Sequence, residues 1–178
     1  VTLTASTNAS NDVNVSNNKS VVVLTPPACA PTVSIVAGKL GVTGQLDGVS
    51  SGATFNYPSA VVQDNAGNIY VLDAYGFGPI QPYRSSTVRK ITPAGIVSTL
   101  AGDMTAPSGS TDSPMGKLAR FGYISYNALA IDKTKNILYF ADDHNNIREI
   151  NLLTGTVSTL ATLQAPAWGL TSIALDYN

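Results

Sequence analysis

Apolar and polar residues along the chain follow the same order twice. The first copy spans residues 64–102 and reads DNAGNIYVLD, then an insertion, then STVRKITPAGIVSTLAG. The second copy spans residues 132–161 and reads DKTKNILYFADDHNNIREINLLTGTVSTLA. Each copy contains an Asp, a turn, a run that ends in Asp, a basic run, a Gly turn and the segment VSTLA. Such repetition is typical of folds built from similar units that bury their faces against one another.

Four short apolar runs separated by turn residues predict four β-strands in each copy. In the segments VRKI and IREI the apolar residues lie three positions apart, so they point to opposite faces of a strand. Both faces of each sheet are therefore expected to be covered. Because no segment keeps a 3.6-residue apolar period, almost no helix is expected. The predicted strands are residues 59–63, 68–72, 87–91, 96–101, 128–131, 137–141, 147–150 and 156–161.

Partial copies flank the two full ones. Residues 32–38, TVSIVAG, copy the VSTLAG segment without the strands that normally precede it, and they predict a closing strand. Residues 170–176, LTSIALD, match the segment NALAID at 127–132 and predict an opening strand. A partial repeat is therefore expected on either side of the full ones.

The first 31 residues differ from the rest. Two β-branched runs within residues 1–24 enclose an Asn/Ser-rich turn and predict a β-hairpin, which is too small to be stable alone. The pair resembles the last hairpin of a bacterial immunoglobulin-like domain. Residues 25–31, TPPACAP, form a Pro-rich linker. Three N-x-S/T triplets are candidate glycosylation sites, although an Asn/Ser-rich loop also matches this motif by chance: Asn8, Asn14 and Asn18.

The sequence pattern of the repeats resembles that of bacterial NHL-repeat proteins over residues 32–178. The shared pattern is F-x-x-P, then D-x-x-G-N-(I/L)-Y-V-x-D, then V-R-K-I-x-P-x-G-x-V-S-T-L-A-G, and it includes Phe55, Arg89 and Gly102. The second copy departs from it at Lys135, where the first has the turn Gly67. The resemblance implies an all-β fold of β-propeller blades. The implied parts are a closing strand at 32–38, full blades at 55–102 and 121–161, and an opening strand at 170–176.

The number of implied blades is too small for a closed ring. Propellers close with about four to eight blades, whereas this chain contains two full ones and parts of others. Three alternatives remain open. The chain is a fragment of a longer protein, several chains share one propeller, or incomplete modules of neighbouring chains stack openly into a filament.

Composition excludes some functions. Charged residues make up 12% of the chain and the net charge is −1, which excludes a strong electrostatic grip on nucleic acid or on an anionic membrane. No apolar run is long enough to span a membrane. The uncharged polar surface is typical of secreted and cell-surface β proteins. With one cysteine, Cys29, and one histidine, His144, no zinc site of soft ligands is expected, and no cofactor is expected.

Four acidic residues recur at equivalent positions of the repeats. A metal or substrate site at a propeller mouth is one interpretation, and turn caps that bind backbone N–H groups are the other. Recurrence favours the structural role, because an active site need not repeat with the blade. These acids are Asp64, Asp73, Asp132 and Asp142.

The cluster of Asp142, Asp143, His144 and Asn145 is either a hard-cation site or an exposed turn, and the turn is favoured. The basic residues Arg89, Lys90 and Arg148 are expected to pair with Asp or with Glu149 at a sheet edge, or else to bind an acidic partner. Aromatic residues in or beside loops are candidate contacts for a glycan or a protein: Tyr75, Phe77, Tyr83, Tyr123, Tyr126 and Trp168.

These observations predict a non-enzymatic, extracellular structural or interaction protein that assembles with copies of itself through its incomplete modules. A ligand-binding or adhesive propeller fragment of a larger surface protein is the alternative. A metal-dependent hydrolase or lactonase of the propeller type is less favoured, and it would require Asp142 or Asp143.

Overall fold

The computed structural model of the chain describes residues 34–74, 85–122, 124, 128–142, 145–164 and 170–176. The chain divides into two units, Val1–Ile35 and Val36–Asn178, and the second is described below. The predicted hairpin and linker at 1–31 lie outside the described residues. So do Asn8, Asn14, Asn18, Cys29, Tyr75, Phe77, Tyr83, Tyr123, Tyr126, Asp143, His144 and Trp168.

The described part of the second unit is all-β, with two short 3₁₀ helices as its only helical elements. One antiparallel sheet has the strand order β1-β5-β4-β3-β2, and the other has the order β6-β7-β8-β9. The eight predicted strands are present as β2 to β9, with ends that differ by at most two residues. The elements are β1 (Gly48–Val49), η2 (Ser50–Gly52), β2 (Tyr57–Gln63), β3 (Ile69–Ala74), β4 (Thr87–Ile91), β5 (Ile96–Ala101), η3 (Gly116–Leu118), β6 (Leu129–Asp132), β7 (Ile137–Ala141), β8 (Asn146–Asn151) and β9 (Val157–Thr162).

The two sheets repeat one another in register. Val71 pairs with Arg89 in the first sheet, and Phe140 pairs with Arg148 in the second. The pairing of β4 with β5 and that of β8 with β9 carry a register shift at the same place. The shift lies between Val88 and Arg89 in the first sheet and between Ile147 and Arg148 in the second. Equal register and equal irregularity make the two sets structural equivalents, so residues can be compared position by position.

The tight turns follow from the residues placed in them. Gly67, between β2 and β3, has a φ of 82°, a conformation that glycine adopts without steric cost. In the second sheet Lys135 replaces this glycine, and the following residue, Asn136, takes the left-handed conformation with a φ of 56°. Asparagine tolerates this region better than most residues, so the departure from the repeat pattern at Lys135 leaves the hairpin intact.

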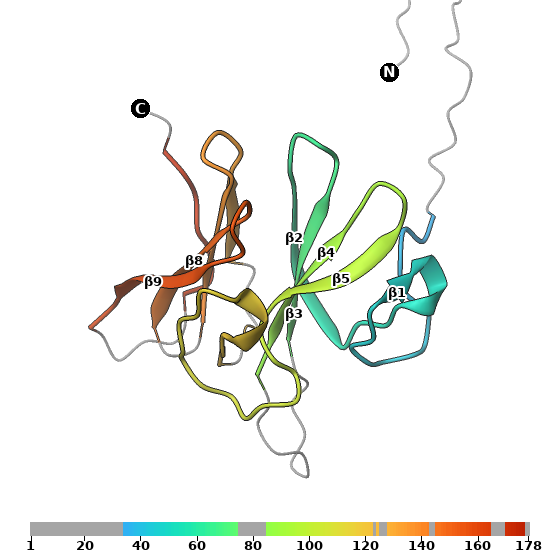
Figure 1. The fold of residues 1–178 in the computed structure, drawn as a ribbon, viewed down its shortest axis with the longest axis horizontal. Helices are drawn as coiled ribbons and strands as arrows, with labels where there is room; N and C mark the ends of the chain where they lie inside the picture. Colours follow the sequence, from blue (N-terminus) through green and yellow to red (C-terminus); the bar gives the residue numbers. More distant parts are fainter. Residues whose placement is uncertain are drawn as a thin grey trace, which may run out of the picture. The chain divides into compact units, whose positions relative to one another are not determined.

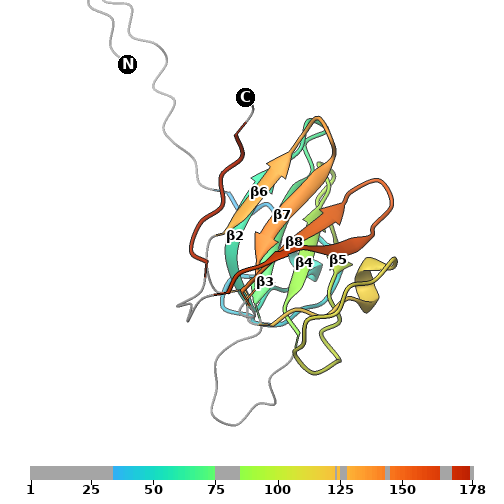
Figure 2. The same ribbon diagram turned by 90° about the vertical axis from the view of Figure 1, so that its left-hand side faces the viewer.

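The main core lies between the two sheets. Strand β2 contacts β6, and from there the sheets extend outward (Figures 1 and 2). The first sheet and the second both contribute side chains that are at most 9% exposed to one apolar cluster. Its strand residues are Tyr70, Leu72, Val88, Ala101, Leu129, Ile131, Leu138, Phe140, Ile150 and Val157.

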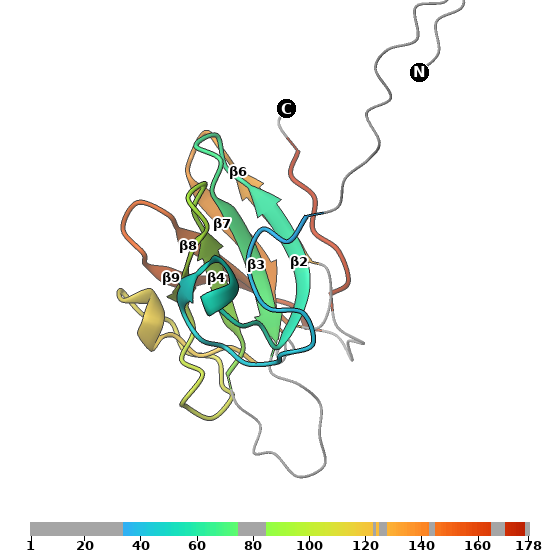
Figure 3. The ribbon, with the colours of Figure 1, turned by 90° about the vertical axis from the view of Figure 1, so that its right-hand side faces the viewer.

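The opposite face of the first sheet is covered by a segment of the chain rather than by another sheet. Residues 36–55, which include β1 and η2, cross this face (Figure 3). Ala53 is buried there with Val71, Ile91 and Val97, and Phe55 packs against them. We call residues 42–55 the first lid. Residues 106–121, which include η3, precede the second sheet in the chain as the first lid precedes β2, and we call them the second lid.

The described residues of the two partial repeats do not form the predicted strands. The described residues 34–38 and 170–176 contain no strand, and this corrects the expectation of a closing and an opening strand. A strand is stabilised by hydrogen bonds to a neighbouring strand, and neither segment has a paired neighbour among the described residues. Gly38 nevertheless matches Gly102. Each has a φ near 90° (95° and 90°), and each lies against the lid phenylalanine of the sheet that follows.

Candidate functional site

Two arginines are the largest fully buried side chains of the described residues. Arg89 on β4 and Arg148 on β8 occupy equivalent positions, and each side chain is 0% exposed. Both strands lie in the interior of their sheets. Both arginines pair with aspartates, as expected. The expected location at a sheet edge is wrong, because the guanidinium groups point inward to the lids. A fully buried guanidinium also cannot meet an acidic partner in solution.

Arg89, on β4, links strand β3 to the first lid. Its Nη1 donates to Asp73 Oδ2 at 3.2 Å and to the Thr54 carbonyl at 3.1 Å. Its Nη2 donates to Asp47 Oδ1 at 2.9 Å and to the Leu46 carbonyl at 2.9 Å. Asp73 is on β3, whereas the other three acceptors belong to the first lid. The guanidinium thus fastens the lid to the sheet.

Arg148 repeats this arrangement in the second sheet. Its Nη1 donates to Asp142 Oδ2 at 3.0 Å and to the Arg120 carbonyl at 3.4 Å. Its Nη2 donates to Asp112 Oδ1 at 2.8 Å and to the Thr111 carbonyl at 3.1 Å. The acceptors again include one strand-end carboxylate, one lid carboxylate and two lid carbonyls, and Nη1 also donates to Ser110 Oγ at 3.2 Å. We call each set an arginine clamp.

A phenylalanine and a threonine complete each clamp. The guanidinium carbon lies 5.1 Å from the ring centre of Phe55 in the first clamp and 5.1 Å from that of Phe121 in the second, a distance suited to cation–π attraction. Thr99 Oγ1 donates to Asp47 at 2.9 Å, and Thr159 Oγ1 donates to Asp112 at 2.8 Å. Each lid aspartate therefore also holds the last strand of its repeat, β5 or β9.

The strand-end acids Asp73 and Asp142 are held in these clamps. The side chains of both are 0% exposed. Asp73 Oδ1 also accepts the backbone N–H groups of Asn56 at 2.8 Å and Tyr57 at 3.0 Å, at the start of β2. Burial raises the pKa of Asp73 to about 6, although those two N–H groups and Arg89 act in the opposite direction.

The raised pKa of Asp73 predicts an unusual pH dependence. Since its folded-state pKa of about 6 exceeds the ordinary value of 3.8, the folded chain takes up this proton first as the pH falls. The contribution of this carboxyl to the free energy of unfolding therefore rises as the pH falls from about 6 towards 3.8, and it is constant below that. Carbon-13 NMR of the carboxyl groups is expected to show Asp73 titrating near pH 6.

Asp64 supplies the control for that titration. Burial alone would raise its pKa, but hydrogen bonds from Asn68, Tyr70 and Ala66 outweigh burial and lower the pKa. Its contribution to stability is present above 3.8 and is lost as the pH falls through its lower folded-state pKa. A pKa of Asp73 at or below that of Asp64 would contradict the predicted order.

The two remaining predicted acids cap turns. Asp64 Oδ1 accepts the backbone N–H groups of Ala66 at 2.9 Å and Asn68 at 2.8 Å. Asp132 Oδ1 accepts those of Thr134 at 2.9 Å and Lys135 at 3.0 Å. Each of these acids therefore holds the hairpin that follows it. No group of three His, Cys, Asp or Glu suited to a metal ion occurs within the described residues.

The residues that the sequence reasoning missed are those of the lids. Asp47 and Asp112 lie in Gly- and Ser-containing segments between the predicted strands, where the sequence pattern indicated no candidate residue. A signal was present, because each lid contains an Asp followed by the triplet A-x-F, at 53–55 and at 119–121.

The lids and sheets leave two unequal outer faces. On the second sheet, Tyr139 and Ile147 are half-buried and Leu160 is 56% exposed. At the equivalent positions of the first sheet, Tyr70 and Val88 are at most 2% exposed, and Leu100 packs against the core. We call the surface around Tyr139, Ile147 and Leu160 the second outer face.

The first sheet shows the converse. Val61 on β2 is 66% exposed, whereas its equivalent Leu129 is 8% exposed in the core between the sheets. Phe55 is half-buried, and its equivalent Phe121 is fully buried. We call the surface around Val61 and Phe55 the first outer face. The second outer face is thus equivalent to the face that the first sheet packs against the second. The first outer face is equivalent to the face that the second sheet packs against the first.

A search of protein families finds no family model that matches the chain, and a search of curated proteins finds no match. No helix among the described residues is long and apolar enough to cross a membrane.

Proposed function

We propose that the chain is a non-enzymatic structural protein of the extracellular space or cell surface that associates with copies of itself. Its two sheets are blades of the NHL-type β-propeller class, and association completes the partial modules into a multi-chain propeller or a filament. The blade assignment is supported by four antiparallel strands in each sheet, extended in the first sheet by the two-residue β1, by the contact of β2 with β6, and by the core between the sheets.

The exposed apolar residues of the two outer faces carry this proposal. Leu160 and Val61 are 56% and 66% exposed, although their equivalents pack against the core between the sheets. Exposed apolar surface of this kind marks interaction sites in soluble proteins. A second sheet of the same kind has the shape and chemistry to cover either face.

The use of the strand-end acids supports a non-enzymatic role. Asp73 and Asp142 are two of the four acids considered for a metal or substrate site at a propeller mouth. Both are fully buried and paired to an arginine, at 3.2 and 3.0 Å. A carboxylate that is committed to holding a lid is a poor general base, because proton transfer would first require breaking its ion pair.

Light scattering coupled to size-exclusion chromatography tests the proposal. We expect a mass that is a multiple of 18.5 kDa and falls on dilution. A folded monomer at every concentration would rule out self-association.

Further repeats of the same polypeptide would cover the two outer faces equally well. A ligand-binding or adhesive propeller domain within a larger surface protein is therefore the second candidate function. A longer gene product with additional copies of the repeat, together with a monomeric mass for this chain, would favour it.

A further inference from the structure

The two outer faces differ in which side of the sheet contact they reproduce. The second outer face repeats the side that the first sheet presents to the second, where Tyr70, Val88 and Leu100 lie. The first outer face repeats the side that the second sheet presents to the first, where Leu129 and Phe121 lie. Register equivalence between the sheets makes these assignments at the level of single residues.

We infer that the first outer face of one copy docks on the second outer face of the next, in the arrangement that the two sheets adopt within one chain. This inference rests on the proposed self-association and specifies its geometry. The occupant of each face is a second copy of this chain. Val61 of one copy then takes the place that Leu129 holds in the internal contact, and Leu160 of the other takes the place of Leu100.

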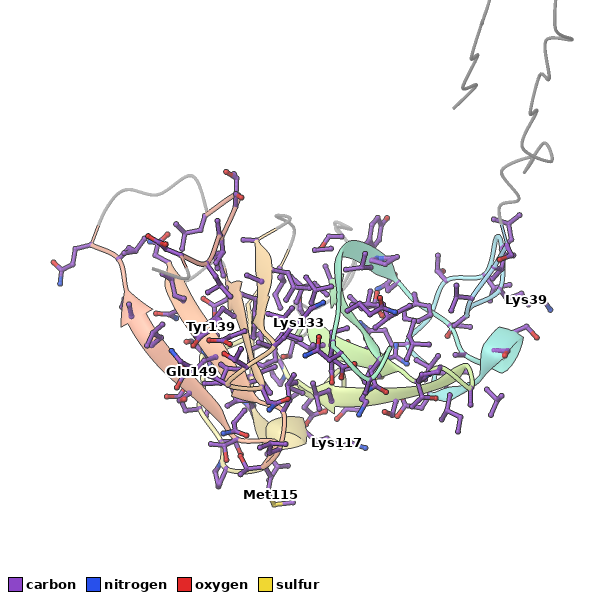
Figure 4. All side chains as sticks on the ribbon, turned by 90° about the horizontal axis from the view of Figure 1, so that it is seen from above. Lys39, Met115, Lys117, Lys133, Tyr139 and Glu149 are labelled. Atoms are coloured by element: carbon purple, nitrogen blue, oxygen red, sulfur yellow. The ribbon has the colours of Figure 1, made fainter. Side chains whose placement is uncertain are left out.

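A dimer that pairs like faces leaves the other two faces uncovered. The first and second outer faces belong to different sheets and lie on opposite sides of the described unit. In Figure 4, Tyr139 and Glu149 mark the second sheet, and Lys39 lies beyond the first sheet at the other end. A contact between unlike faces is head-to-tail, and it leaves one free face on each end of a pair. It therefore continues to a ring or to a fibre.

Two variants, each blocking one face, test the geometry. Val61→Glu places a charge on the first outer face, and Leu160→Glu places one on the second. Both side chains are more than half exposed, at 66% and 56%, so either change is expected to leave the fold intact. Leu153→Glu is the matched control, because Leu153 is 77% exposed in the turn between β8 and β9 and is not among the residues that define either face.

Each blocked variant alone is expected to be a monomer by light scattering, while Leu153→Glu assembles like the unmodified chain. An equimolar mixture of Val61→Glu and Leu160→Glu is expected to form a one-to-one dimer and nothing larger. That dimer joins the intact second outer face of the first variant to the intact first outer face of the second variant.

Other outcomes separate the inference from the proposed function. If the unmodified chain is monomeric, self-association itself is absent. If the unmodified chain assembles and either variant assembles to the same mass, the contact uses other surfaces or pairs like faces, and the head-to-tail inference is overturned. Two monomeric variants that fail to combine on mixing overturn it as well. Circular dichroism of each variant checks that its fold is retained.

Discussion

Replacing Arg89 with methionine is expected to lower the free energy of unfolding by about 3–5 kcal/mol, because it leaves a buried carboxylate without its counter-charge. Asp73 would stay fully buried beside an apolar side chain, and the Thr54 and Leu46 carbonyls would each lose the hydrogen bond from the guanidinium. The Leu46 carbonyl would keep the backbone N–H of Thr54 as a donor. The first lid would also lose its attachment to β4. Urea unfolding followed by circular dichroism measures the loss.

The repeat supplies an internal replicate of this experiment. Arg148→Met is expected to cause a loss of the same order, since Arg148 makes the equivalent contacts in the second clamp. Lys117→Met is the control for removing a positive charge, because Lys117 is exposed on η3. A loss of less than about 1 kcal/mol at Arg89 would place the clamp among ordinary surface ion pairs and contradict its assigned role.

A double-mutant cycle separates the ion pair from the rest of the clamp. Asp73→Asn keeps an oxygen that can accept the N–H groups of Asn56 and Tyr57 but removes the charge. In the presence of Arg89 this change is expected to be costly. After Arg89→Met it is expected to cost much less, because the lone buried charge is already the source of the loss.

The strands could be predicted because the signals for them are local. Asp64 and Gly67 fix one turn, and alternating apolar residues on either side fix which positions pair. The spacing of Val88 and Ile91 also predicted that both faces of β4 would be covered, and these residues do lie in the two separate cores. Because side chains alternate between the two faces of a strand, the local sequence alone predicts which face each one occupies.

The clamps could not be predicted in the same way, because they join residues that are far apart in the chain. Arg89 lies 42 residues after Asp47 and 16 after Asp73. Arginine is rarely buried unless it is paired, so its position in a strand first indicated a sheet edge. The guanidinium can be buried only because the first lid packs against it and supplies Asp47 and two carbonyls, whose hydrogen bonds offset the loss of hydration. The predictions of lone strands at 32–38 and 170–176 depended on local pattern alone. No neighbouring strand pairs with residues 34–38 or 170–176 in the part of the chain that the structure describes.

Truncating Phe121 to alanine is expected to lower the free energy of unfolding by about 3–5 kcal/mol. The ring is fully buried between the sheets and meets Phe140 edge to face, with ring centres 4.9 Å apart and planes at 86°. It also lies beneath the Arg148 guanidinium. Its removal therefore takes away apolar burial, an aromatic pair and part of the second clamp at once. Urea unfolding of the variant measures the sum.

Phe55→Ala is the matched control, because Phe55 makes the same contact with its arginine but is only half-buried on the first outer face. Full burial of a phenylalanine side chain is worth about 1.5–3 kcal/mol, so this change is expected to cost roughly 1–2 kcal/mol in the monomer. Equal losses at Phe55 and Phe121 in a monomer would mean that the first sheet adds nothing to the burial of Phe121. If copies associate head to tail, the loss at Phe55 should instead grow with protein concentration, since the partner then covers the ring as the first sheet covers Phe121.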